Sequence, residues 1–224
     1  MGDMIGLIAA TIAFVGGHFV LSHPLRAPMV ARLGENAFLG VYSIFALAAL
    51  GWMILAYRAA PSGEALWAAN EAIWIVATLL MWIAAIFWAG SLVGNPALPN
   101  PAAKKAAIKE PAGVFRITRH PMMWSFAIWG FVHLLIAPRA DNLVLCGGII
   151  ILALVGSRLQ ERKKFVAMGD AWVQWQSRTN FIPFARGFAF PGWMAVIVGT
   201  VAWLALSWLH MPLAGMPAGI FFWL

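Results

Sequence analysis

Six long apolar stretches dominate the sequence, and polar segments separate them. Hydrophobic residues make up 62% of the chain and charged residues 10%, which is far from the balance of a soluble globular domain. A helix needs about 20 apolar residues to cross a bilayer. The pattern therefore predicts an all-α, polytopic membrane protein with about six transmembrane helices. The stretches are Met4–Leu21, Phe38–Tyr57, Leu66–Gly90, Met122–Ala137, Leu143–Ser157 and Trp193–His210.

The basic residues are divided unequally between the two ends of these stretches. If each stretch crosses the bilayer, the loops 22–37, 91–121 and 158–192 share one side and hold thirteen of the fifteen Lys and Arg residues. The other side holds Arg58 and Arg139. Because cytoplasmic loops are enriched in Lys and Arg, we predict that these three loops are cytoplasmic and that both termini lie outside. The predicted protein is a single domain over residues 1–224, multi-pass in the cell (inner) membrane.

The fourth and fifth stretches are shorter than a typical span, so two arrangements are open. Each stretch crosses the bilayer, or the two together form a re-entrant hairpin that returns to the cytoplasmic side. A hairpin would bury Arg139 and Asp141 at its tip, which is costly in hydrocarbon. This cost favours spanning, and the orientation of the remaining helices is the same in both arrangements.

The two longer loops carry their own helical signals. Within 91–121, a short helix is predicted over Ala102–Glu110 between prolines. The loop 158–192 is predicted to begin as a continuation of the fifth helix, with a break at Gly169 and Asp170 and a second helix on the membrane surface. The apolar tail Met211–Leu224 is predicted to lie at the outer interface.

The net charge of +7 would suggest a nucleic-acid ligand in a soluble protein. Here the basic residues border apolar stretches, so the bilayer and its anionic headgroups are the expected partners, and nucleic acid is not. Glu71 is expected to be structural, either paired with Arg139 or at the interface.

Histidines within or at the ends of the stretches are the first candidates for chemistry, because ionisable residues inside a membrane are costly. His133 lies deep in the fourth stretch, on one helical face with Met122, Phe126 and Trp129. A single imidazole in an aromatic pocket suits an axial haem ligand, whereas the alternative is a structural hydrogen bond to a neighbouring helix. His18 follows Gly16 and Gly17, which allow a helix or a flat cofactor to approach closely.

Polar groups on the predicted cytoplasmic side form the second candidate site. The triplet 119–121 places Arg119 and His120 before a proline that starts the fourth helix. Arg158 and Glu161 share a face at the end of the fifth. A cluster of Arg26, Arg119 and Arg158 would bind haem propionates, a phosphate or lipid headgroups, and the sequence leaves these three options open.

The chain resembles the NnrU family over nearly its whole length. That resemblance implies a multi-helix membrane protein linked to denitrification and nitric oxide metabolism. The runs that carry it are Gly17–Arg26, Ala31–Ser43, Thr118–Trp124, Trp129–His133 and Gly156–Lys164.

A more distant similarity links the chain to the 15-cis-zeta-carotene isomerase of plants and cyanobacteria, which binds haem b. Its intramembrane ligand lies in a Trp-Cys-x-x-His stretch, which corresponds to Trp129–His133, although Gly130 stands in place of the cysteine. The resemblance implies haem b with His133 and His18 as tentative iron ligands, and isomerase-type redox chemistry on an apolar small molecule. The residues assigned to hold the rest of the cofactor are Arg26, Arg119, His120 and Arg158.

The C-terminal half is also similar to the isoprenylcysteine carboxyl methyltransferases. The shared positions include the triplet 119–121, then Glu161, Gly169, Trp172 and the run Phe181–Pro183. Residues 160–161 are Gln-Glu where that group has paired glutamates, and tryptophan stands where it has tyrosine. The resemblance therefore implies a shared fold and leaves use of S-adenosylmethionine open.

Three functional hypotheses follow from these observations. The first is a haem-binding membrane protein of the NnrU family. The second is a non-catalytic accessory or regulatory protein of a respiratory nitrogen-oxide complex. The third is a methyltransferase-like enzyme.

Overall fold

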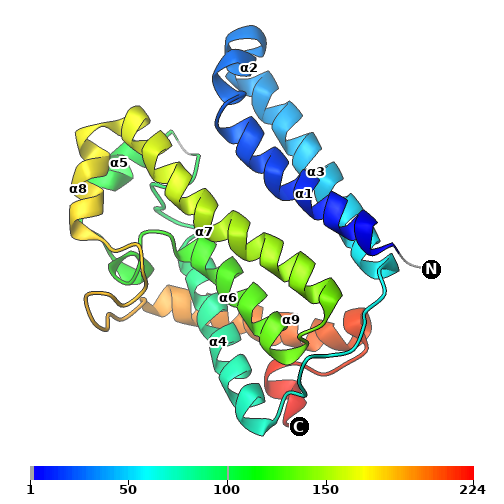
Figure 1. The fold of residues 1–224 in the computed structure, drawn as a ribbon. Helices are drawn as coiled ribbons and strands as arrows, with labels where there is room; N and C mark the ends of the chain where they lie inside the picture. Colours follow the sequence, from blue (N-terminus) through cyan, green and yellow to red (C-terminus); the bar gives the residue numbers. More distant parts are fainter. Residues whose placement is uncertain (1–2, 100) are drawn as a thin grey trace. The chain divides into compact units, whose positions relative to one another are not determined.

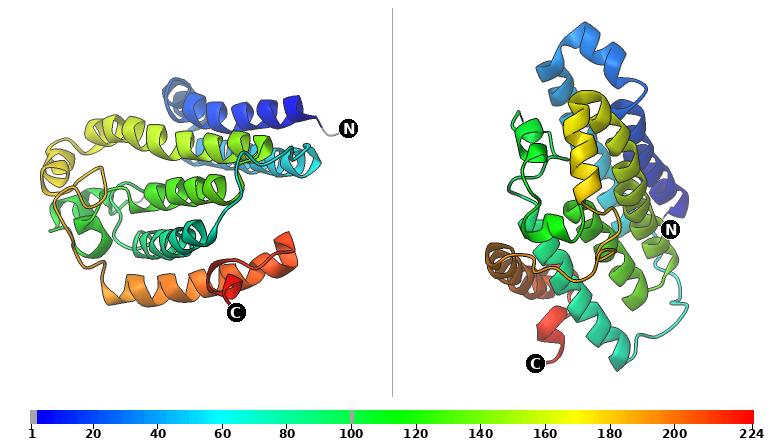
Figure 2. Two further views of the ribbon diagram at one scale, coloured as in Figure 1. Left: turned by 60° about the horizontal axis from the view of Figure 1, so that its bottom comes forward. Right: turned by 90° about the vertical axis from the view of Figure 1, so that its left-hand side faces the viewer.

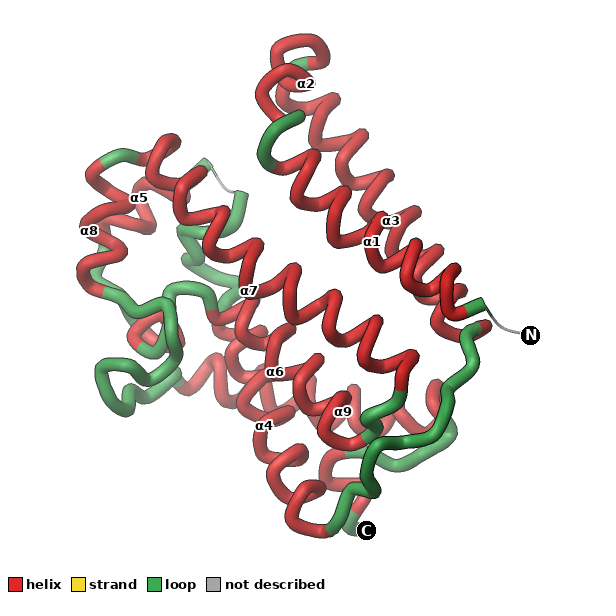
Figure 3. Tube along the Cα trace, viewed as in Figure 1, coloured by secondary structure: helices red, strands yellow, loops and turns green. Residues whose placement is uncertain are grey.

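A computed structural model describes residues 3–99 and 101–224, and all regular structure in these ranges is helical (Figure 3). This confirms the predicted all-α class. Five of the described helices, α1, α3, α4, α7 and α9, are long and apolar enough to cross a membrane, and α6 is a shorter apolar helix. The elements are α1 (Met4–Ser22), α2 (Arg26–Leu33), α3 (Glu35–Ala59), α4 (Glu71–Gly90), α5 (Ala103–Ile108), η1 (Gly113–Arg116), α6 (Pro121–Ile136), α7 (Ala140–Met168), α8 (Asp170–Arg178), α9 (Trp193–Ala214) and η2 (Gly219–Phe222).

Helix α7, which contains the fifth stretch, is long enough to span the bilayer. It has 29 residues, which at 1.5 Å per residue gives about 44 Å and exceeds the hydrocarbon thickness. It continues beyond the apolar stretch, as predicted, and ends before Gly169, whose φ of +56° suits glycine and separates α7 from α8. Helix α6 has 16 residues and begins at Pro121, which is the predicted start.

Some expected boundaries are wrong. Residues 66–70 precede the third long helix instead of forming its first turn, because Asn70 caps α4 by accepting a hydrogen bond from the Ile73 N–H at 3.0 Å. The short helix of the second loop runs only from Ala103 to Ile108. Arg139 forms an ion pair with Asp141 through two 3.2 Å contacts, and the pairing with Glu71 stays a prediction.

The chain forms two compact units, each described by itself below. The first comprises residues 1–68 and 133–152, and the second comprises 69–132 and 153–224. Within these ranges, residues 1, 2 and 100 lie outside the described residues. The prediction of a single domain over residues 1–224 did not anticipate this division, and it stays a prediction.

In the first unit, α1 and α3 lie side by side (Figure 1). Leu7 and Ala10 of α1 and Met53 of α3 form its buried core. The Tyr57 hydroxyl donates a 2.6 Å hydrogen bond to the Asn142 side-chain oxygen, which joins α3 to the beginning of α7. Gly17 lies against the Phe45 ring, so this glycine accommodates a neighbouring helix.

In the second unit, α4 and α9 pack closely against each other (Figure 2). A Cβ on Gly199 would lie 2.6 Å from the Ile86 Cα, so the two backbones meet at this glycine. Ala195, one turn earlier, is also buried. Small residues four apart are how helices approach closely in membranes. The C-terminal tail folds back on this pair, with Trp74 and Phe222 stacked at 3.9 Å.

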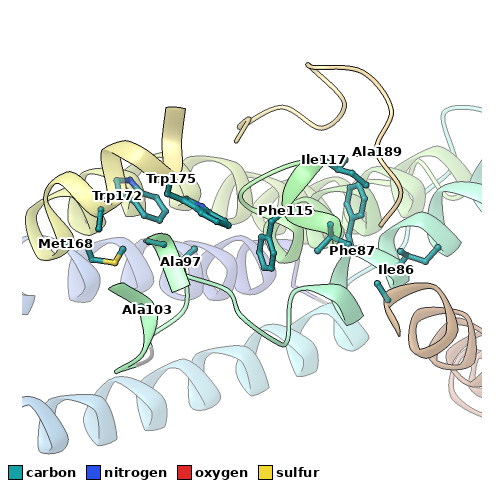
Figure 4. Close-up of a cluster of buried hydrophobic side chains, with 14 residues drawn as sticks. Ile86, Phe87, Ala97, Ala103, Phe115, Ile117, Met168, Trp172, Trp175 and Ala189 are labelled. Atoms are coloured by element: carbon teal, nitrogen blue, oxygen red, sulfur yellow. The ribbon is translucent and has the colours of Figure 1, made fainter. Parts of the chain in front are cut away.

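The predicted cytoplasmic loops of the second unit share a compact aromatic core with the ends of α4 and α9 (Figure 4). Trp172 and Trp175 of α8 are fully buried beside Phe115 of η1 and Met168 of α7. Lys164 donates to the main-chain oxygens of Pro96 and Leu98, both at 2.8 Å, and so holds the loop after α4 against α7. These contacts hold the loops in a defined structure, so their side chains can form a binding site.

The close approach of α4 and α9 generates a prediction. Gly199→Ala should lower the stability of the detergent-solubilised protein by about 1–3 kcal/mol, because the added methyl group overpacks the helix backbone. Gly51→Ala on α3 is the control, since nothing lies within 4 Å of its Cβ position. Thermal unfolding measures both variants. An unchanged Gly199→Ala melting temperature would show that the helices do not meet at this residue.

Candidate functional site

The turn before α6 is held by the irregular segment that follows α8. The main-chain N–H of Arg119 donates to the Asn180 oxygen at 2.7 Å. The Thr118 hydroxyl and the Trp124 indole N–H both donate to the Phe181 oxygen, at 2.7 and 2.8 Å. These bonds join residues about 60 positions apart and fix the Phe181 side chain beside the turn.

Glu161 of α7 brings the charged side chains of this turn together. Its Oε1 accepts a hydrogen bond from Arg119 Nε at 2.5 Å and lies 3.2 Å from His120 Nε2. Its Oε2 lies 3.9 Å from Arg158 Nη1, one turn earlier on α7. We call Arg119, His120, Arg158 and Glu161, with the ring of Phe181, the polar cluster. Its first four members are the residues expected to share the predicted cytoplasmic side.

Phe181 packs against three members of the polar cluster. The guanidinium carbon of Arg158 lies 3.7 Å from the ring centroid, and that of Arg119 lies 5.7 Å away. His120 meets the same ring edge-on, at 5.4 Å between centroids. Burial differs sharply within the cluster, because the His120 side chain is fully buried whereas that of Arg158 is 58% exposed.

Two nitrogen atoms beside the cluster, His120 Nδ1 and Trp172 Nε1, are buried without a hydrogen-bond partner among the described residues, as are the indole nitrogens of Trp175 and Trp203. The rings of His120 and Trp172 lie 6.4 Å apart between centroids. Burial lowers the pKa of His120 below its ordinary value of 6.5, although the bond to Glu161 opposes the shift. The neutral ring then donates from Nε2 to Glu161 and leaves Nδ1 as an unused acceptor. Unused buried polar atoms are costly, so this arrangement suits a site that receives a polar group.

His18 lies in the first unit among aromatic rings. Its Nδ1 lies 2.7 Å from the Phe14 oxygen, which fixes Nδ1 as the protonated nitrogen. The ring meets Phe14 and Tyr42 edge-on, at 4.5 and 5.6 Å between centroids. A metal-binding histidine characteristically donates its other N–H to an oxygen in this way.

Arg26 belongs to the same row of side chains as His18. It forms an ion pair with Glu35 and lies 5.6 Å from the Phe38 ring, which in turn lies 6.1 Å from the Tyr42 ring. Arg26, Phe38, Tyr42 and His18 therefore form a continuous aromatic row with a cation at one end. We call this row the His18 row.

The structure divides the predicted site residues between the two units. His18, Arg26 and the half-buried His133 belong to the first, whereas Arg119, His120 and Arg158 belong to the second. The structure brings the last three together with Glu161, and the cluster of three arginines stays a prediction. The contacts that Phe181 and Trp172 make with His120 were not predicted, although both residues are among the positions that carry the methyltransferase resemblance.

Comparison with protein-family models gives a match to the NnrU protein family over residues 6–218. The chain belongs to the NnrU family. The match covers most of its length and confirms the family predicted from the sequence. Comparisons with curated proteins and with solved structures found no match. The likenesses of this NnrU protein to the isomerase and to the methyltransferases stay predictions.

The Arg119–Glu161 pair generates a prediction about stability. Glu161→Gln leaves the Arg119 guanidinium, only 10% exposed, without its counter-charge. We expect a loss of about 3 kcal/mol, the lower end of the range for a buried pair, because Glu161 keeps some exposure. Glu110→Gln is the control, since Glu110 pairs with Arg178 but is 84% exposed. Equal melting temperatures for the two variants in detergent would contradict the account of this pair.

The burial of His120 generates a pH dependence. The unfolded imidazole takes up a proton near pH 6.5, whereas the buried ring stays neutral to lower pH. Protons therefore bind the unfolded state preferentially in this window, so stability is full above pH 6.5 and falls as the pH is lowered. Unfolding of the wild type and of His120→Gln between pH 7.5 and 5 measures this contribution. The variant should show the shallower slope, and equal slopes would contradict a neutral buried His120.

Proposed function

We propose that this NnrU protein binds haem b in its first unit, with His18 as an axial ligand, and acts in the inner cell membrane in nitric oxide metabolism or in redox conversion of an apolar molecule. The observation that carries the proposal is the hydrogen bond between His18 Nδ1 and the Phe14 oxygen. It orients the ring and leaves the Nε2 lone pair for iron. Bound haem would supply one-electron chemistry.

The His18 row offers contacts for both the flat ring and the propionates of a haem group. Its rings supply apolar, flat surfaces next to the proposed ligand. Arg26 begins α2, just after the turn that follows the helix carrying His18. A guanidinium has five N–H donors, so Arg26 retains donors for a propionate after pairing with Glu35.

His133 is proposed as the second axial ligand. It lies in the last turn of α6, is half-buried, and falls in the same unit as His18. Its place in an apolar helix, on one helical face with Phe126 and Trp129, is the feature that supports this role. Arg119, His120 and Arg158 belong to the other unit, so the proposal does not depend on them.

The proposal is tested by a pyridine haemochrome assay and by oxidised and reduced absorption spectra. The protein is purified in detergent from cells supplied with a haem precursor. The wild type should carry near-stoichiometric haem b. His18→Ala should lose most of it, and His133→Ala should shift the Soret band or lose haem, because each removes an iron ligand.

His210→Ala is the matched control, because His210 also lies in a long apolar helix, near the end of α9. It should retain the wild-type haem content and spectrum. A colourless wild type would overturn the proposal and favour the accessory role beside a respiratory complex. Full haem content in the double variant His18→Ala, His133→Ala would show that the ligands lie elsewhere.

A further inference from the structure

The polar cluster of the second unit carries more positive than negative charge. The guanidinium groups of Arg119 and Arg158 share one carboxylate, that of Glu161, and burial keeps His120 neutral. Arg119 takes the short contact of 2.5 Å, which leaves Arg158 at 3.9 Å, the limit of an ion pair. The cluster therefore holds one positive charge that its own carboxylate does not neutralise.

Arg158 presents this charge in a fixed orientation. Its guanidinium lies 3.7 Å from the centroid of the Phe181 ring, and such stacking orders the plane of the group. The main chain of Phe181 is held by the hydrogen bonds that its oxygen accepts from Thr118 and Trp124. Its ring packs edge-on against His120 and Trp124, at 5.4 and 6.2 Å between centroids. A planar guanidinium held in this way offers its edge donors as a fork, which matches the oxygens of a phosphate.

The buried nitrogen atoms near Phe181 need a different ligand group, one that both donates and accepts hydrogen bonds. His120 Nδ1 needs a donor and Trp172 Nε1 needs an acceptor, and both atoms are buried without partners among the residues described. A hydroxyl group satisfies both at once, because it donates one hydrogen bond and accepts another. His120 and the Arg158 guanidinium lie near each other, because both contact the Phe181 ring and both approach the Glu161 carboxylate.

We propose that the polar cluster binds a phosphate ester that carries a hydroxyl group, with the phosphate on Arg158 and the hydroxyl directed to His120 and Trp172. Arg158 directly follows Ser157, the last residue of the fifth apolar stretch. The site therefore lies where a span meets water, and both a lipid headgroup and a soluble phosphate ester can reach it. This proposal does not rest on the proposed haem site, since the residues of the polar cluster belong to the second unit.

Binding is tested on the full-length protein with two probes. The lipid probe is phosphatidylglycerol, titrated into nanodiscs of phosphatidylcholine. The soluble probe is glycerol 3-phosphate, compared with methyl phosphate, which lacks the hydroxyl. The readout is the indole N–H signal of Trp172 in NMR spectra, identified by its loss in Trp172→Phe.

Arg158→Gln and Arg162→Gln form a matched pair of variants. Both remove one positive charge from the same helix, one turn apart, and Arg162 is exposed. Arg158→Gln should weaken binding of the preferred probe at least about tenfold, whereas Arg162→Gln should change it less than about twofold. Arg158→Lys keeps the charge but loses the fork and the stacking, so it should fall between them.

The outcomes distinguish the sources of the phosphate. Saturable shifts with phosphatidylglycerol alone support a lipid headgroup, and saturable shifts with glycerol 3-phosphate, stronger than with methyl phosphate, support a soluble ester. Equal weakening in the two glutamine variants would overturn the site, because it would show a general electrostatic effect of the membrane surface. A loss of haem in Arg158→Gln as large as in His18→Ala would also overturn it, since Arg158 would then hold a propionate.

Discussion

The ion pair between Arg119 and Glu161 is the interaction on which the second unit depends. It joins the turn before α6 to the extension of α7, across 42 positions of sequence. The same arginine fixes the segment after α8 through its main-chain N–H, and the same carboxylate orients His120. Because both charged side chains are largely buried, neither is tolerated alone, so the loops of this unit are ordered as one structure.

The remaining chemistry of the cluster follows from how this carboxylate is shared. Glu161 makes its short contact with the buried Arg119. Arg158 is more exposed, lies farther from Glu161 and stacks its guanidinium on the Phe181 ring. His120 uses one ring nitrogen on Glu161 and leaves the other without a partner. An anion at the exposed Arg158 and a hydroxyl at the buried His120 are the groups that would satisfy these side chains. The His18 row of the first unit has a different character, since aromatic rings and a single oriented imidazole suit an iron cofactor.

The features of the fold that depend on local sequence were predictable. Hydropathy revealed the long helices, proline marked the start of α6, and glycine marked the break between α7 and α8. The start of α4 was missed, because an apolar run does not show that Asn70 caps the helix. Arg119, His120, Arg158 and Glu161 were recognised as a group on one side from their positions at helix ends. Their pairing was not predicted, since it joins Glu161 to a turn 42 positions earlier and no local pattern reveals such a contact. The stacking on Phe181 was missed because this residue lies in an irregular segment without a periodic signal.

The central claim is that this NnrU protein has two separate sites, an iron site in the first unit and a phosphate site in the second. The most direct test is to titrate the preferred phosphate probe into haem-free and haem-loaded protein while following the Trp172 indole signal. The account predicts the same dissociation constant in both forms. Loss of phosphate binding on haem loading would contradict it, because the polar cluster would then be part of the haem site.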